Sequence, residues 1–182
     1  GAVIDTAKII SKNPIICYPT TAAGSSSTSW SVYWDGKEKC SIKRMLPKEV
    51  ILDGNFVKDL PNNVVMNTTF DVVSHCLDSL CSKKSTEESI KYCNEALDIL
   101  RNKTSNLDLL KAGDIAGKAI EITGTNLLHS LSYPLTGNFD IDHGLALGYF
   151  LPKLQEFMGF DVSDIIGEYE IKLIFNLDFV LD

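Results

Sequence analysis

The residues of this chain with the clearest metal chemistry are its three histidines and one aspartate. Asp71 and His75 stand four residues apart, so on a helix both side chains project from one face, about one turn apart. His129 and His143 follow later in the chain. Three imidazoles and one carboxylate can hold a divalent cation such as Fe²⁺, Zn²⁺ or Co²⁺. A four-ligand metal site is therefore one interpretation, and ordinary histidines with satisfied polar groups are the other.

Composition excludes several other classes of protein. The 182 residues carry a formal net charge of −7 without a dense cluster of Lys and Arg, which argues against a nucleic-acid partner. Hydrophobic residues make up 45% of the chain and charged residues 23%, the proportions of a globular protein. No apolar run reaches the length of a membrane span, so we expect no membrane partner.

Cysteine usage indicates the compartment. The chain has five cysteines, an odd number, and they lack CxxC spacing. Neither a disulfide framework nor a cysteine-type zinc site is therefore expected. A reducing cytoplasm fits this pattern, with most of the cysteines acting as small buried hydrophobic residues. They are Cys17, Cys40, Cys76, Cys81 and Cys93.

The first third of the chain has the pattern of an α/β segment. Residues 3–10 suit a short helix beside Gly1, and the apolar run 15–18 is typical of a buried strand. The loop 19–29, PTTAAGSSSTS, follows that strand directly, where α/β folds place ligand-binding loops. A flexible linker is the alternative interpretation of this loop.

Two further strand signals precede a change of pattern. Residues 31–42 alternate around Asp35-Gly36, a strong hairpin signal. Residues 50–52 predict another buried strand. Pro61 and the asparagines after it then mark the start of a mostly helical region.

The helical region divides into several predicted helices. Asn67 to Thr69 offer N-caps for a helix over 70–80. Ser85 and Glu88 form an S-x-x-E capping box before the next helix. A third helix is expected over 107–123.

The remaining helices carry the last two histidines. Gly124 should end the third helix, and a short helix then presents His129. Gly137-Asn138 predicts a turn, and His143 begins an apolar helix. No internal repeat interrupts this order.

The order of the motifs resembles the iron-containing (group III) alcohol dehydrogenase family. Family members carry a GGGS-x2-D-x-AK turn, a PTT-x-GTGSE loop, a DA-x2-H-x2-E helix, an H-x3-HPL stretch and an HG-x6-LP segment. The counterparts here are GAVIDTAK (1–8), PTTAAGSSS (19–27), FDVVSHCLD (70–78), HSLSYPL (129–135) and HGLALGYFLP (143–152). STEES (85–89) and SYPLT (132–136) are similar to the branch that contains phosphonoacetaldehyde reductases.

The resemblance implies a dehydroquinate-synthase-like fold. Residues 1–62 would be part of a Rossmann-like α/β domain that binds NAD or NADP, and 63–182 part of an all-α metal-binding domain. The opening glycine turn and the apolar stretch 168–182 predict that the fold continues beyond both ends of this sequence. A homodimer or larger homo-oligomer is expected by the same resemblance.

The resemblance also implies roles for individual residues. The metal, Fe²⁺ or Zn²⁺, would be bound by Asp71, His75, His129 and His143. His129 and His143, together with Tyr133, would form the catalytic group. The residues expected to contact the cofactor are Gly1, Asp5, Lys8, Thr20 and Thr21.

The implied reaction is the interconversion of a small alcohol and its aldehyde or ketone. The metal would polarise the carbonyl and the nicotinamide would deliver hydride. Alternatives are a glycerol-dehydrogenase-like polyol oxidase and a dehydroquinate-synthase-like lyase. A non-catalytic metal-binding remnant is the alternative from outside the enzymes.

Four positions depart from the family pattern. Tyr133 replaces the second histidine of H-x3-HPL, and with an ordinary pKa near 10 it is a poorer proton relay. The 19–27 loop lacks the family's glutamate. Asp142 stands where proline is common and is interpreted as a turn residue, with orientation of a histidine ligand as the alternative. Asp78 replaces a glutamate, at what we interpret as a helix-packing position.

Overall fold

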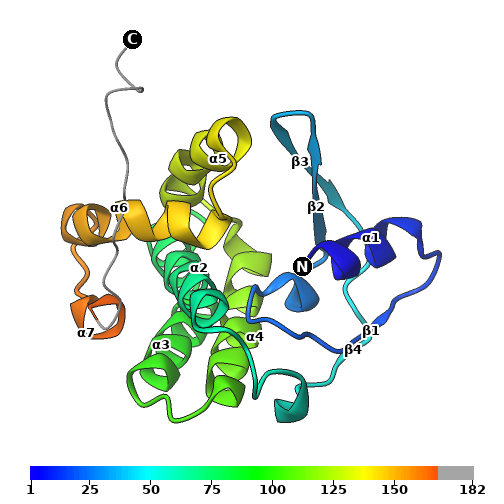
Figure 1. Ribbon diagram of the computed structural model, residues 1–182, viewed down its shortest axis with the longest axis horizontal. Coiled ribbons are helices and arrows are strands. Elements are labelled where there is room, and N and C mark those ends of the chain that lie inside the picture. Colours follow the sequence, from blue (N-terminus) through cyan, green and yellow to red (C-terminus); the bar gives the residue numbers. More distant parts are fainter. Residues whose placement is uncertain (168–182) are drawn as a thin grey trace.

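The computed structural model describes residues 1–167, in which a bundle of helices adjoins a smaller α/β part (Figure 1). The apolar stretch 168–182 lies outside the described residues. None of the helices formed by residues 1–167 is long and apolar enough to cross a membrane.

The α/β part contains the predicted helix and hairpin. The two strands predicted to be buried are only two residues long: the first buries Cys17 but leaves Ile16 51% exposed, and the second ends at the half-buried Val50. Ile16 pairs with Glu49 and Cys17 with Val50 in a short parallel ladder. Among the described residues, no other strands pair in parallel. A separate antiparallel hairpin packs against the first helix. The elements are α1 (Ala2–Ile10), β1 (Ile16–Cys17), η1 (Ser25–Ser27), β2 (Trp30–Asp35), β3 (Glu38–Lys43), β4 (Glu49–Val50) and η2 (Gly54–Phe56).

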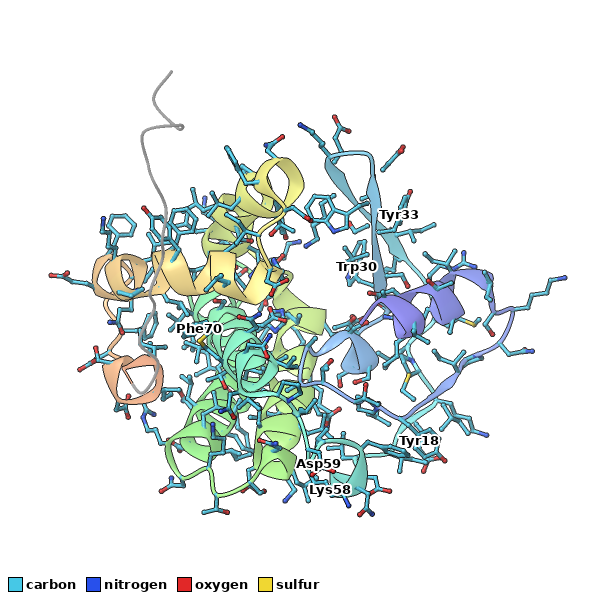
Figure 2. The ribbon with its side chains drawn as sticks, in the orientation of Figure 1. Tyr18, Trp30, Tyr33, Lys58, Asp59 and Phe70 are labelled. Carbon is cyan, nitrogen blue, oxygen red and sulfur yellow. The ribbon has the colours of Figure 1, made fainter. Side chains whose placement is uncertain are left out.

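The hairpin has one face of mixed aromatic and basic character. Its register pairs Trp34 with Lys39, Val32 with Ser41 and Trp30 with Lys43. Because side chains alternate along a strand, these six residues share a face, and Tyr33 lies on the other (Figure 2).

The helical part is built around α2, which contacts four of the other helices. Residues 68–79 of α2 are all buried, so this helix is core on every side rather than amphipathic. Phe70 lies within this core (Figure 2). The helices are α2 (Asn62–Leu80), α3 (Glu87–Arg101), α4 (Asn106–Thr123), α5 (Leu127–Phe139), α6 (His143–Phe157) and α7 (Ser163–Ile166).

The predicted start of α2 is wrong by several residues. The helix begins at Asn62, after Pro61, rather than at residues 67–69. The hydroxyls of Thr68 and Thr69 donate to carbonyls one turn earlier, Val64 and Val65 respectively. These threonines are therefore satisfied inside the helix and do not cap it.

Two other local predictions are corrected. The capping box of α3 is formed by Thr86 and Ser89, one residue later than the predicted Ser85 and Glu88. Helix α5 continues through Gly137, and the turn falls at Asp140, which has φ 55°. A Cβ at Gly137 would lie 2.5 Å from the Lys37 carbonyl oxygen, so this glycine serves a close approach to the hairpin rather than a turn.

Small residues on α6 bring its first turn onto α2. A Cβ at Gly144 would lie 2.1 Å from the carbonyl oxygen of Asn67, and one at Gly148 would lie 2.5 Å from the ring of Phe70. Larger side chains would therefore force the two helices apart. This close packing places His143, the first residue of α6, beside Asp71.

Candidate metal centre

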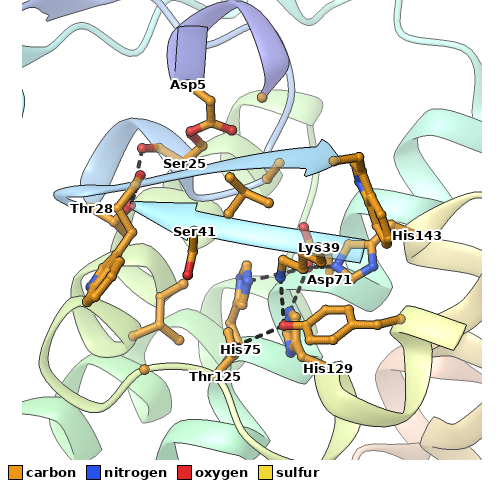
Figure 3. Close-up of a pocket in the computed structure, with 18 residues that line it drawn as sticks. Asp5, Ser25, Thr28, Lys39, Ser41, Asp71, His75, Thr125, His129 and His143 are labelled. Atoms are coloured by element: carbon orange, nitrogen blue, oxygen red, sulfur yellow. Dashed lines mark hydrogen bonds and ion pairs between the residues drawn. The ribbon is translucent and has the colours of Figure 1, made fainter. Parts of the chain in front are cut away.

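Three helices bring the four predicted ligands together. Asp71 and His75 lie one turn apart on α2, His129 lies in the first turn of α5, and His143 opens α6 (Figure 3). Residues that are far apart in the sequence of the helical part thus have their side chains directed toward the same place.

Asp71 is at the centre of this cluster. Its Oδ1 lies 3.4 Å from Nε2 of His75, 3.4 Å from Nε2 of His129 and 3.8 Å from Nε2 of His143. The rings of His75 and His129 stack with centroids 4.7 Å apart. One atom of each of Asp71, His75 and His129 lies within 4.8 Å of the others. The cluster is buried except at His143, whose side chain is 35% exposed.

The donor atoms fit a divalent cation. Asp71 Oδ1 and His129 Nε2 are both buried without a hydrogen-bond partner, which is costly unless something else binds them. Ligands at about 2.0–2.2 Å from one tetrahedral ion stand roughly 3.3–3.6 Å apart. The distances from Asp71 to His75 and His129 fall in that interval, so these residues suit Fe²⁺ or Zn²⁺.

Two of the histidines are held in the neutral form that binds metals. Burial lowers the pKa of His75 from its ordinary 6.5 to about 4, although the charge of Asp71 opposes this. Burial likewise lowers the pKa of His143 to about 4, and the neighbouring His129 and Lys39 add to the effect. Both imidazoles are therefore uncharged near neutral pH.

Asp71 and His129 have shifts in the opposite sense to what burial alone would give. Burial disfavours the Asp71 carboxylate, but the surrounding histidines outweigh it and lower the pKa of this carboxyl far below its ordinary value. Burial also opposes a charge on His129, yet the nearby carboxylate of Asp71 and the hydrogen-bonded carboxylate of Asp78 raise its pKa. The site therefore presents an ionised carboxylate.

Comparison with known proteins identifies the family. The sequence model described as "Fe-containing alcohol dehydrogenase family, C-terminal" matches residues 65–170, which include all four candidate ligands. The chain belongs to the iron-containing alcohol dehydrogenase family. The predicted resemblance is thereby confirmed.

Individual relatives agree with this family assignment. It is 27% identical over 159 residues to the phosphonoacetaldehyde reductase of Streptomyces viridochromogenes, covering 79% of this chain and 40% of the relative. The iron-containing alcohol dehydrogenase of Thermotoga maritima superimposes with a TM-score of 0.76 at 29% identity, over 98% of this chain and 53% of that one. The chain thus spans about half the length of such relatives.

A third relative was solved with a nucleotide. The sulfoacetaldehyde reductase of Bifidobacterium kashiwanohense, in complex with NAD+, superimposes with a TM-score of 0.73 at 28% identity, over 79% of this chain and 43% of that one. These likenesses confirm the predicted fold at the level of the family.

A pocket of about 480 Å³ adjoins the ligand cluster. The α/β part supplies one wall, with Gly1, Asp5, the 23–28 loop and the hairpin, and the helical part supplies the other. Of the predicted cofactor residues, Gly1 and Asp5 line the pocket. Thr20 and Thr21 precede the loop and are not among the lining residues.

Lys8, also predicted to contact the cofactor, is directed into the protein. Its ammonium donates to the carbonyls of Ser25 at 2.9 Å and Thr28 at 3.2 Å, and to that of Trp30. It lies 3.5 Å from the carboxylate of Asp5. Burial lowers the pKa of Lys8, against the attraction of Asp5. The structure thus gives Lys8 a role in holding the 25–30 loop.

Tyr133 lies at the mouth of the ligand cluster. Its ring stacks on His143 with centroids 6.2 Å apart. Its hydroxyl accepts a hydrogen bond from Lys39 at 2.6 Å and lies 3.3 Å from the hydroxyl of Thr125 (Figure 3). Tyr133 therefore connects the hairpin to the helical site.

Two residues of the site were missed from the sequence. Lys39 enters the pocket from β3. The alternation of side chains along the hairpin could have indicated on which face of the hairpin Lys39 lies, but not that this face meets Tyr133. Asp78 was interpreted as a helix-packing residue, whereas its carboxylate is fully buried and bonds to His129 Nδ1 at 2.9 Å. Its position seven residues after Asp71, two turns along one helix face, was the available signal.

Asp142 accepts a hydrogen bond from Asn67 at 3.1 Å and stands at the start of α6, as a turn residue would.

Proposed function

We propose that this chain supplies the metal site, and one wall of the nucleotide site, of an NAD(P)-dependent oxidoreductase. The reaction interconverts a small alcohol and its aldehyde or ketone. One observation carries the proposal: an ionised buried carboxylate and three imidazole nitrogens converge beside a pocket between the two parts of the chain.

Asp71, His75, His129 and His143 are proposed to hold the metal, with iron favoured by the family description. A bound Fe²⁺ or Zn²⁺ would supply Lewis acidity toward the substrate oxygen. The chain itself holds these donor atoms in place and shields Asp71, His75 and His129 from bulk solvent. All four residues line the pocket, and His143 is the most exposed of them.

Tyr133 is proposed to orient the substrate oxygen or its proton at the pocket mouth. It stacks on His143 and is fixed in place by Lys39 and Thr125. A phenol hydroxyl can donate to an alcohol or carbonyl oxygen while accepting from a lysine.

The cofactor is proposed to enter between α1 and the hairpin. Gly1 precedes α1, whose free N–H groups and dipole favour an anion such as a pyrophosphate. Asp5 faces the same pocket, and Thr20 and Thr21 lead into the 23–28 loop that lines it. The carrier of hydride would be the nicotinamide, as NAD or NADP. The fold around it is proposed to be Rossmann-like over residues 1–62.

The substrate is proposed to be small, because the pocket also has to admit a nicotinamide. Among the residues that line it in the described part, Lys39 carries the one cationic side chain. An ammonium there suits an oxygen-rich partner, either a cofactor group or an acidic substrate. Relatives named for phosphonoacetaldehyde and sulfoacetaldehyde support the acidic aldehyde.

The compartment is proposed from the cysteines, and the assembly from the family resemblance. All five cysteines are free thiols, which supports a reducing cytoplasm. A homodimer or larger homo-oligomer follows the family resemblance.

A panel of aldehydes tests the function. The full-length protein, loaded with Fe²⁺, would be assayed with NADH and NADPH against neutral and acidic short aldehydes. We expect reduction that is lost on chelation and restored by Fe²⁺. A full-length protein that binds neither metal nor reduced nucleotide would overturn the proposal.

A further inference from the structure

The fully buried carboxylate of Asp78 makes more contacts with the metal site than a packing residue needs. It lies on α2, on the face that carries Asp71, and it faces the first turn of α5. Its Oδ2 accepts from the backbone N–H of Asn126 at 2.8 Å and of His129 at 3.3 Å, and its Oδ1 accepts from that of Leu128 at 2.9 Å.

These bonds replace a missing cap. Asn126 stands at the N-cap position of α5, but its own side chain makes no capping hydrogen bond. The first N–H groups of a helix need acceptors, and a carboxylate there also interacts favourably with the helix dipole. Asp78 therefore anchors the start of α5 from a neighbouring helix.

The same carboxylate reaches the His129 ring. Oδ2 lies 2.9 Å from Nδ1, and an ionised carboxylate can only accept, so Nδ1 must carry the proton. In the neutral ring the lone pair then belongs to Nε2, the atom 3.4 Å from Asp71 that is buried without a partner. A histidine in the other tautomer could not ligate through Nε2.

The other two histidines lack such support. Nδ1 of His75 is buried with no hydrogen-bond partner, and Nδ1 of His143 has the hydroxyl of Ser132 at 3.4 Å. Within the described residues, His129 is thus the candidate ligand whose ring is held by a charged acceptor.

We propose that Asp78 is a positioning residue for the metal site, which fixes both the place of α5 and the Nδ1–H tautomer of His129. The inference rests on the proposed metal site. Second-layer carboxylates of this kind typically change metal affinity by about 10- to 100-fold.

Asp78→Asn is the decisive variant because it keeps the shape of the side chain and removes its charge. The amide oxygen, placed where Oδ2 was, can still accept from Asn126 and His129, but the amide N–H₂ group then faces the N–H of Leu128 and that bond is lost. The acceptor for Nδ1–H of His129 becomes neutral and therefore holds this tautomer less strongly than a carboxylate does. We expect the Zn²⁺ dissociation constant of the full-length protein, measured by chelator competition, to rise about 10- to 100-fold. Asp78→Glu, which keeps the carboxylate, should recover part of the affinity.

A matched control separates positioning from stability. Asp108, in the first turn of α4, accepts from the backbone N–H groups of Thr104 and Ser105 just before that helix, and its hydrogen-bond partners include no histidine. Asp108→Asn should lower the melting temperature and leave the Zn²⁺ dissociation constant unchanged. Long-range ¹H–¹⁵N spectra at mildly alkaline pH add a direct reading of the ring, with Nδ1–H expected in the Zn²⁺-loaded wild type and a larger share of Nε2–H in metal-free Asp78→Asn than in the metal-free wild type.

Each failure has its own signature. If the wild type does not bind Zn²⁺, the metal site itself is wrong. If wild type and folded Asp78→Asn bind Zn²⁺ equally, only the role of Asp78 is wrong. Should Asp78→Asn fail to fold, an Nε2–H ring in the Zn²⁺-loaded wild type still overturns the inference.

Discussion

The proposed metal site in the helical part and the loop region of the α/β part differ in how their candidate functional side chains are fixed. Asp71 and His75 are set by the geometry of one helix, and α5 and α6 add His129 and His143 through close helix packing. In the α/β part, Gly1 and Asp5 reach the pocket while Thr20 and Thr21 do not.

The loop region is organised by contacts from distant residues. Glu121 on α4 accepts from both the backbone and the hydroxyl of Ser29, and Asp114 accepts from the hydroxyl of Ser27. Lys8 holds the same loop from the other side. On a helix, the spacing of residues in the sequence fixes where their side chains lie relative to one another. In a loop, the conformation depends on which groups bind its backbone.

The largest expected effect is loss of metal from the helical site. His129→Ala or His143→Ala should remove the bound ion and lower turnover by more than about 100-fold, because the bound ion would lower the reaction barrier by several kcal/mol. Elemental analysis of the purified variants measures it. Ser130→Ala, an exposed neighbour on α5, is the control. Unchanged metal stoichiometry in either histidine variant would contradict the ligand assignment.

The next effect separates the two regions. Lys8→Met should lower the free energy of unfolding by about 3 kcal/mol, because Asp5 and three backbone carbonyls lose a buried ammonium partner. The helical site should keep its metal. Urea denaturation measures the first and elemental analysis the second, with exposed Lys12→Met as the control. Loss of metal in Lys8→Met would show that the two regions do not act independently.

Acidification should weaken the metal-free helical part. The pKa of both His75 and His143 is lowered from 6.5 to about 4 in the folded chain, so between these values protons bind the unfolded state preferentially. The free energy of unfolding in chelator should therefore fall as pH drops from 6.5 toward 4. The raised pKa of His129 acts in the opposite sense, being stabilising at low pH.

Thermal melts across this pH range check the slope. His143→Gln should make it shallower, since one of the two groups is removed. A melting temperature that stays constant or rises on acidification would contradict the predicted direction.

A smaller effect is expected at the junction of the two regions. Tyr133→Phe should cost about 1 kcal/mol of stability through its lost bonds to Lys39 and Thr125. Tyr133→His should keep the metal and flatten the acid limb of the pH–rate profile, because imidazole titrates nearer neutral pH. Complete loss of folding in either variant would show that Tyr133 is a core residue instead.

The smallest effect concerns the threonines outside the pocket lining. Thr21→Val should raise the KM for NADH up to about fivefold, the cost of one neutral hydrogen bond, if the threonine contacts the cofactor as predicted. Steady-state kinetics with Thr6→Val, on the exposed side of α1, as the control measure it. An unchanged KM would place the cofactor away from Thr21.

The sequence by itself determined the order of most elements and the donor set of the proposed metal site. The i, i+4 pair Asp71 and His75 follows from helical periodicity, and the Asp35-Gly36 hairpin follows from turn preferences. Both are local properties, in which neighbours along the chain decide the geometry. The motifs around them identified the family.

Only the tertiary structure decided which distant groups meet. The approach of α6 to α2 at Gly144, the bonding of Lys8 to loop carbonyls, and the contact of Lys39 with Tyr133 all join residues far apart in the chain. Asp78 is the clearest case, because its spacing from Asp71 indicates a shared helix face but not that it caps α5 and holds the ring of His129. Such contacts depend on how the helices and the hairpin pack together. That packing is set by side chains from the whole chain, so the spacing of neighbouring residues does not predict it.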